Sequence, residues 1–270
     1  MNLRRHAFVA VVSLLALLFL WAPLAMVTVN AFNRNELLTS WDGATTRWFD
    51  EAVRDPQIRD ALRQTLVIAL LCTAVSLPLA VTAVLWWRRA SPHRRRWFDA
   101  LVYLNVILPE VVFASAIFLL FVRLHVETGL VAVVIGHSVW NTAFAILILE
   151  ARLSALDPAL EEVAADLGAS SWQVFRRVTI PGLLPGMLVA ALIVFTFSFD
   201  DVVTSFFLAG SQVNTLPLVL FGLIRFHVTP EINAIGVLVM SFTASAVLVG
   251  YVVLSRVNRQ RRGGAPAGIA

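Results

Sequence analysis

The chain has 270 residues, of which 59% are hydrophobic and 14% are charged, and its formal net charge is +4. Soluble domains carry about 25% charged residues, so this composition excludes an ordinary soluble fold. The positive balance does not indicate a nucleic-acid partner, because the arginines flank apolar segments and form no soluble basic face.

Six segments, taken in chain order, are long enough to cross a bilayer core of about 30 Å, which takes about 20 helical residues. They are Ala7–Phe32, Ala61–Trp87, Ala100–Val122, Thr128–Leu149, Gly182–Ala209 and Ile232–Ser255. Backbone polar groups in lipid must be bonded within the protein, and none of these segments alternates as a barrel strand does. The sequence therefore predicts an all-α polytopic membrane protein with six transmembrane helices.

The arginines predict the orientation of these helices. With the amino terminus inside, the inner segments hold 14 of the 21 basic residues, and every basic residue is arginine. The positive-inside rule then places both chain ends in the cytoplasm. We expect residues 1–60 to form an uncleaved first helix and a periplasmic loop. Residues 61–255 form a core of five helices with a cytoplasmic loop at 150–181, and residues 256–270 form a disordered cytoplasmic tail.

Residues suited to catalysis or metal binding are scattered along the chain. Cys72 is the single cysteine and lies within the second predicted span, where a lone thiol most often serves packing. The five histidines have no second ligand at helical spacing, and there is no glycine-rich phosphate loop. We therefore expect neither a metal site nor an enzymatic activity on this chain.

The polar insert between the fourth and fifth spans, residues 150–181, is the most informative segment. Asp157 is a good N-cap and Pro158 suits a first helical position, so a helix should run over Leu160–Leu167. Gly168 suits the left-handed residue that ends a helix. The insert should therefore begin with a short, well-defined helix.

A second short helix should follow the first. Ser170 and Gln173 have the spacing of a capping box, which predicts a helix from Ser171 to about Thr179. Pro181 should lie beyond its end. Two short helices at a fixed angle suit the docking of a soluble partner, although an ordinary solvated loop could have the same caps.

The spacing of this insert resembles the EAA loop of permease subunits in binding-protein-dependent ABC importers. That pattern reads E-A-A, three residues, G, nine residues, then I-x-L-P. The chain has Glu162-Val163-Ala164, then Gly168 after three residues, then Val178-Thr179-Ile180-Pro181 after nine more. The departures are Val163, Val178 and Ile180, which are conservative in size.

The resemblance implies the type I ABC importer permease fold (MetI-like) in a bacterial inner membrane. It implies that the first short helix docks on a cytoplasmic ATPase subunit. The implied partners are a second permease subunit, two ATPase subunits and a periplasmic solute-binding protein. This chain would carry no cofactor, because ATP and Mg would bind the ATPase. The implied ATPase-coupling residues are Glu161, Glu162, Ala164, Asp166, Gly168 and Pro181.

Further segments resemble the second permease subunit of spermidine/putrescine importers, the polyamine branch of that family. They are Asn30–Asn33, Trp41–Gly43, Thr45–Trp48, Ser198–Val203, Thr215–Leu218 and Thr229–Ala234. We therefore expect a polyamine as the solute. A ferric ion or a thiamine-like cation stays open within the same class. A secondary transporter is the alternative outside it, but that class would not need the coupling loop.

Ionisable residues inside spans cost about 3 kcal/mol unless they face a partner or water, so each is a functional candidate. Asp200 and Asp201, near the outer end of the fifth span, suit a cationic solute or end the span in interfacial water. Glu110 follows Pro109 in the third span and either lines the solute path or pairs with backbone at the proline break. Trp140 offers a ring face to a cation or packs between helices. The candidate solute path is Glu110, Trp140, Asp200 and Asp201.

Overall fold

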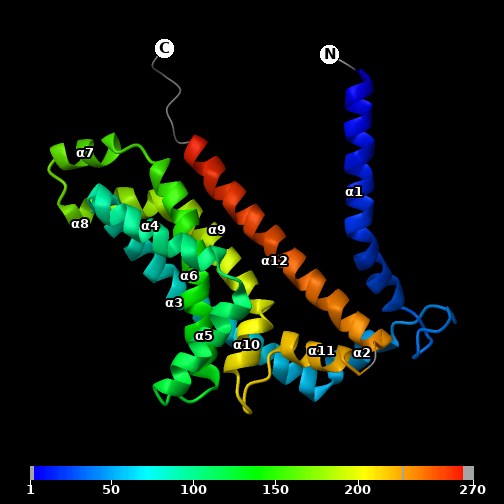
Figure 1. Cartoon of the computed structure of the whole chain (residues 1–270). Helices are drawn as coiled ribbons and strands as arrows, with labels where there is room; N and C mark the ends of the chain where they lie inside the picture. The colour runs from blue at the N-terminus through cyan, green and yellow to red at the C-terminus, as the bar shows by residue number, and fades with distance from the viewer. Residues whose placement is uncertain (1–2, 227, 264–270) are drawn as a thin grey trace. The chain divides into compact units, whose positions relative to one another are not determined.

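The computed structural model describes residues 3–226 and 228–263, and the regular structure of these residues is helical (Figure 1). An isolated antiparallel bridge joins Asn33 and Ala44 in the loop after the first helix. The chain divides into two units. One consists of residues 1–60 and 219–244, and the other of residues 61–218 and 245–270.

Five described helices are long and apolar enough to cross a membrane, and a bent pair makes a sixth span if it is counted as one. The five are α1 (Leu3–Asn30), α3 (Pro56–Arg89), α6 (Leu130–Ser154), the continuous helix Ser171–Phe199 and α12 (Pro230–Gly263). The bent pair is α4 (Pro92–Ile107) with α5 (Glu110–Arg123). The prediction of an all-α protein with this set of apolar spans is confirmed.

The third predicted span, Ala100–Val122, is not one straight helix. The chain breaks at Leu108 and Pro109, and α5 turns by 106° from α4. Leu108 has an extended ψ of 135°, as expected of a residue whose helical conformation would clash with a following proline ring. Pro109 brings no backbone N–H to the helical ladder. Glu110 therefore starts a new helix instead of lying within one.

The helix that follows the polar insert passes through the proline at which it was predicted to end. It comprises α8 (Ser171–Val174), the π-helical segment η1 (Phe175–Thr179) and α9 (Ile180–Phe199). A π-helical turn holds one extra residue, so the backbone is widened directly before Pro181. We infer that this widening accommodates the proline ring, which would clash with the preceding turn of a regular helix. The predicted end before Pro181 is wrong.

The fifth predicted span, Gly182–Ala209, ends earlier than expected. Helix α9 stops at Phe199, and α10 (Val203–Leu208) begins after three non-helical residues. The side chain of Asp201 accepts hydrogen bonds from two backbone N–H groups in the first turn of α10, at 2.8 and 3.2 Å. This capping favours a new helix over continuation of the old one, so the prediction of a single helix is wrong.

The core of the unit formed by residues 61–218 and 245–270 lies where α6 packs along α9. Its fully buried side chains include Val84 of α3, Leu149 of α6 and Leu183 of α9. The approach of α6 and α9 is close, since a Cβ at Gly186 would lie 2.7 and 2.8 Å from side-chain carbons of Arg152. Small residues at such crossings let membrane helices pack tightly.

The unit formed by residues 1–60 and 219–244 has its own small core around Trp48, in α2 (Arg47–Arg54). The Trp48 side chain is buried with Ala31 and Ala234, and its Nε1–H donates to the backbone carbonyl of Asn33 at 2.7 Å. This pairing satisfies the polar edge of the indole ring, which would otherwise be costly to bury. It fixes α2 beside the end of α1.

The predicted disordered tail at 256–270 is helical in its first part. Helix α12 continues to Gly263, so residues 256–263 extend the last helix beyond its apolar span. The prediction of disorder is wrong for these residues. Residues 264–270 lie outside the part of the chain that the structure describes.

We predict that Gly186→Ala destabilises the protein by about 1–3 kcal/mol, because the added methyl group overlaps Arg152 at the α6–α9 crossing. Gly222→Ala is the matched control. Gly222 lies in α11 (Leu216–Ile224), and a Cβ there meets nothing within 4 Å. The control should be neutral or stabilising by up to about 1 kcal/mol. Unfolding of the two purified variants in detergent measures this difference, and equal effects would contradict the packing account.

Candidate functional site

The polar insert forms the first short helix that the sequence predicted, and the second helix begins where it was predicted but continues to Phe199. Helix α7 (Ala159–Asp166) starts after Asp157, whose Oδ1 accepts from the Ala159 N–H at 2.9 Å. Gly168 follows the helix with a φ of +84°, in the left-handed region that favours glycine. The turn between α7 and α8 therefore depends on a residue without a side chain.

The capping box at the start of α8 is also confirmed. The Ser170 hydroxyl accepts from the Gln173 N–H at 3.3 Å, and the Gln173 side chain accepts from the Ser170 N–H at 2.8 Å. The two bonds satisfy donors that a helix start leaves open. The angle between α7 and α8 is thus set by local chemistry.

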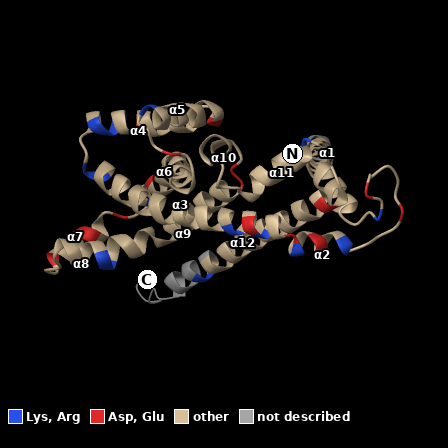
Figure 2. Ribbon diagram, turned by 90° about the horizontal axis from the view of Figure 1, so that it is seen from below, with Lys and Arg blue, Asp and Glu red and all other residues tan. Residues whose placement is uncertain are grey.

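The insert exposes large apolar side chains although its helices are short and polar. Leu167 is 83% exposed and Trp172 is 65% exposed. Leu160 and Val163 are exposed on α7 as well, and so are the carboxylates Glu162 and Asp166. Figure 2 shows acidic residues on α7 and basic residues farther along the helix that α8 begins. Exposed apolar side chains among charges are typical of a protein–protein interface.

Glu161 differs from the other acidic residues of α7 because its carboxylate is bound within the chain. Arg88, at the end of α3, donates two hydrogen bonds to it, from Nη1 to Oε1 at 2.9 Å and from Nη2 to Oε2 at 2.6 Å. The Thr179 hydroxyl donates to Oε1 at 2.6 Å. The arginine and glutamate side chains are 30% and 22% exposed. Bidentate pairing of this kind is strong and directional.

The electrostatic environment of Glu161 favours its charged form. Burial raises the pKa of this carboxyl group, but hydrogen bonds from Arg88 and Thr179 and the charges of Arg88 and Arg89 outweigh it. The net effect holds the pKa of Glu161 below its ordinary value. A cavity of about 540 Å³ lies beside this pair, between the end of α3 and helices α7 and α8.

A second cluster of charged and polar groups is buried at the break between α9 and α10. His137 of α6 is fully buried, with Nδ1 at 2.8 Å from the Ser198 hydroxyl and Nε2 at 3.2 Å from the Ser205 hydroxyl. Its Nε2 also lies 3.5 Å from Asp201 Oδ2. Glu110, at the start of α5, interacts electrostatically with both His137 and Asp201. Two broken spans thus meet through these side chains.

The predicted solute-path residues divide between different surroundings. Asp201 is buried in the cluster just described, whereas Asp200 is exposed, so these neighbours do not form one two-carboxylate site. The Trp140 ring packs 5.0 Å from Phe113 and 6.1 Å from Phe144, between ring centroids. Glu110 and Asp201 are therefore brought together, and Trp140 and Asp200 are not part of their cluster.

Sequence reasoning missed His137, which it treated as one of several scattered histidines. The available signal was its position inside an apolar span, where an ionisable side chain needs a partner. Its partners lie 61 to 68 residues away in the sequence, in α9 and α10. Local spacing could not reveal them.

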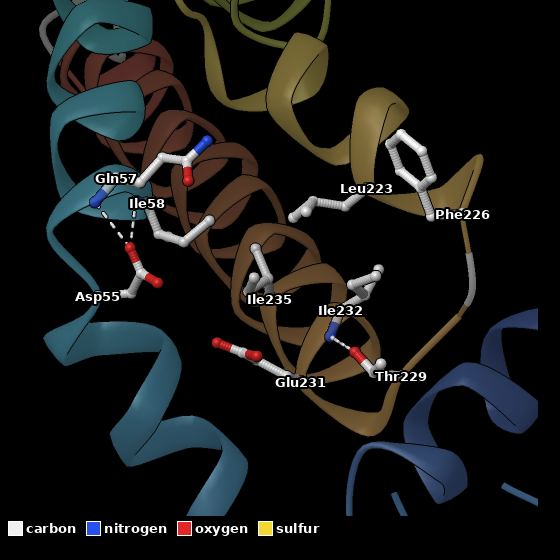
Figure 3. Close-up of a pocket in the computed structure, with 9 residues that line it drawn as sticks. All are labelled: Asp55, Gln57, Ile58, Leu223, Phe226, Thr229, Glu231, Ile232 and Ile235. Atoms are coloured by element: carbon white, nitrogen blue, oxygen red, sulfur yellow. Dashed lines mark hydrogen bonds between the residues drawn. The ribbon is translucent and has the colours of Figure 1, made fainter. Parts of the chain in front are cut away.

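A separate cavity of about 290 Å³ lies within the unit formed by residues 1–60 and 219–244 (Figure 3). Its two acidic lining residues, Asp55 and Glu231, lie at the starts of helices. Asp55 Oδ1 accepts from the N–H groups of Gln57 and Ile58 at 2.7 and 3.1 Å, and Glu231 lies in the first turn of α12. Acidic side chains stabilise helix starts, which accounts for both of them. We assign no ligand to this cavity.

Comparison with known proteins places the chain in a family of membrane transport components. The family model described as "Binding-protein-dependent transport system inner membrane component" matches residues 76–263. The putrescine transport system permease protein PotI of Escherichia coli strain K12 is 31% identical over 258 residues, which cover 93% of this chain and 92% of that protein. The spermidine/putrescine transport system permease protein PotC of the same strain is 26% identical over 239 residues, 87% of this chain and 89% of that one.

The fold also matches solved structures. A chain of a bacterial ABC transporter involved in the import of the acidic polysaccharide alginate superposes with a TM-score of 0.66 at 18% identity. The match covers 97% of this chain and 96% of that one. The expected type I ABC importer permease fold is confirmed.

We predict that Asp201→Ala lowers the stability of the protein by about 1–3 kcal/mol, because the N–H groups that Asp201 accepts from are buried and would lose their acceptor. Asp200→Ala is the matched control, one residue away and exposed, with an expected effect within about 0.5 kcal/mol. Thermal unfolding in detergent compares the two variants. A larger loss for Asp200→Ala would contradict the placement of these carboxylates.

We also predict a pH-dependent effect of Glu161→Gln. Because the folded chain lowers the pKa of Glu161, its charged form stabilises the fold above the ordinary glutamate pKa of about 4.3. That contribution is lost as the pH falls through the lowered value. The stability difference between wild type and variant should therefore be largest near neutral pH and shrink in acid. Denaturant unfolding over this pH range measures it, and a difference that grows in acid would refute the pairing.

Proposed function

Since the chain belongs to the binding-protein-dependent transport system inner membrane component family, we propose that it is the transmembrane permease subunit of an ATP-driven importer of polyamines. The observation that carries the solute assignment is its likeness, over nearly its whole length, to a putrescine permease. A ferric ion or a thiamine-like cation would be carried by the same class of subunit.

In this function the chain acts as one part of a larger importer. It pairs with a second permease subunit and receives solute from a periplasmic solute-binding protein. Two cytoplasmic ATPase subunits bind ATP and Mg, and this chain has no catalytic role. The arginine distribution supports placing both chain ends in the cytoplasm of a bacterial cell.

The surface formed by α7 and α8 is the proposed docking site for the ATPase. Its exposed side chains include Glu162, Asp166, Leu167 and Trp172, a combination of apolar and acidic groups. Ala164 is partly buried in α7, where its small side chain permits close approach of neighbouring atoms. Gly168 and Pro181 set the backbone path on either side. ATP-driven closure of the ATPase would move this surface and, through it, the membrane helices.

The proposed solute path contains acidic groups that suit a cationic solute. Glu110 and Asp201 lie near each other where the two spans break. Asp200, which precedes Asp201 in the sequence, is exposed, and Trp140 contributes an aromatic ring. The membrane potential assists entry of a cation by about 2.3 kcal/mol per charge per 100 mV. Because the solute must also leave, these groups act as weak binding points.

Uptake of labelled putrescine and spermidine by cells with and without the gene tests the solute assignment. Polyamine uptake that requires the gene, in cells lacking other polyamine importers, supports it. Unchanged uptake after deletion in that background would reject the polyamine assignment and direct the search to other cations.

We predict that Gly168→Val abolishes most of this uptake. A β-branched residue with a positive φ costs about 1–2 kcal/mol and would disturb the turn that orients α7. Gly168→Asn is the matched control, because asparagine tolerates the left-handed conformation. It should retain more uptake than the valine variant at equal membrane abundance. Equal activity of the two variants would contradict a role for this turn.

A further inference from the structure

We propose that Glu161 is a positioning residue that, with Arg88 and Thr179, locks α7 onto the cytoplasmic end of α3 and onto the helix that enters the membrane. This inference rests on the proposed function and changes the role expected for one residue of the loop. Glu161 lies beside acidic residues of the docking surface but does not belong to that surface. We call the three side chains the Glu161 clamp.

The clamp joins three elements that are far apart in the sequence. Glu161 comes from α7, Arg88 from the last turn of α3, and Thr179 from the last position of η1. Both carboxylate oxygens are used, since Oε2 accepts from Arg88 and Oε1 accepts from Arg88 and from Thr179. Such a carboxylate has little capacity left for a partner protein.

The arginine of the clamp is held in place by its own surroundings. Arg95, in the first turns of α4, donates to the backbone carbonyls of Trp87, at 2.9 Å, and of Arg88. Its guanidinium group also stacks over the Trp87 ring, 4.8 Å from the centroid. These contacts satisfy carbonyls that the end of α3 leaves open. Arg88 therefore presents its guanidinium group from a fixed helix end.

The threonine of the clamp connects α7 to the membrane core. Thr179 is buried, and η1 continues without interruption into α9. Helix α9 in turn packs along α6 in the core of its unit. A displacement of α7 would thus be transmitted by a hydrogen bond to η1, which leads into α9, and by an ion pair to α3.

The neighbouring carboxylates differ from Glu161 in a way that separates the two roles. Glu162 and Asp166 are exposed, and the structure gives neither side-chain carboxylate a hydrogen bond or an ion pair to another described residue. They remain available to a partner, whereas Glu161 is engaged within the chain. Docking and attachment therefore use different residues of the same short helix, and Glu162 serves as a matched control for Glu161.

Distances between spin labels in the purified full-length chain test the clamp without any partner. Labels would be attached at Thr82→Cys on α3 and Asp166→Cys on α7, both exposed positions, in a Cys72→Ser background. We expect a narrow distance distribution in the parent chain and in Glu162→Gln. Glu161→Gln and Arg88→Glu should each broaden it at least twofold.

The charge-swapped double variant Arg88→Glu/Glu161→Arg separates pairing from a general loss of structure. It should restore a narrow distribution, because the opposite charges again face each other. An unchanged distribution in Glu161→Gln and Arg88→Glu would overturn the proposal. A double variant as broad as the single ones would overturn it as well.

The assembled importer supplies a second readout that separates the clamp from the proposed function. Glu161→Gln should leave ATPase-subunit binding unchanged but lower the solute transported per ATP several-fold, and the charge-swapped variant should recover it. Glu162→Gln should weaken ATPase binding. Equal loss of ATPase binding in Glu161→Gln would make Glu161 a docking contact and overturn the proposal. If the parent chain binds no ATPase, the proposed function is rejected. The spin-label distances still test the clamp, because they are measured without a partner.

Discussion

Every backbone N–H and C=O group that enters the hydrocarbon core must be bonded within the protein, and this constraint governs the rest of the structure. Long helices satisfy this constraint along most of each span. At the two places where a span breaks, other groups must bond to the backbone. One break precedes Glu110 and the other contains Asp201. Asp201 satisfies the backbone of the new helix and approaches His137, which bonds back to α9. Polar side chains thus compensate for the loss of helical bonding at the break that contains Asp201.

Local chemistry shapes the polar insert, where the chain leaves α6 and returns through α8 and α9. Each turn of the insert has a local cause: a left-handed glycine at Gly168 and a capping box at Ser170. The π-helical segment lets the returning helix pass Pro181 without a break. The exposed surface of α7 is therefore connected to the membrane helices through the turn into α8, which continues into α9, and through the Glu161 clamp. In the proposed function, this surface moves together with the membrane helices when the ATPase closes.

Much of this organisation could be read from the sequence because local chemistry determines it. The lengths of the apolar segments predicted the spans. Gly168 and the Ser170 capping box predicted where the helices of the insert end and begin. The errors arose where a local compensation or a contact between distant residues determines where a helix ends. A π-helical turn removed the expected stop at Pro181, and side-chain capping by Asp201 divided the fifth span. His137 and the partners of Glu161 were out of reach, because their contacts join residues 18 to 73 positions apart.

The most direct test of the central claim is solute transport by the reconstituted importer: this chain, its partner permease, the ATPase subunits and the binding protein in proteoliposomes. Labelled putrescine should cross the membrane only when ATP is present on the ATPase side and the binding protein is present on the opposite side. Transport should persist when ion gradients are collapsed. Transport driven by an ion gradient without ATP would contradict the account and indicate a secondary transporter.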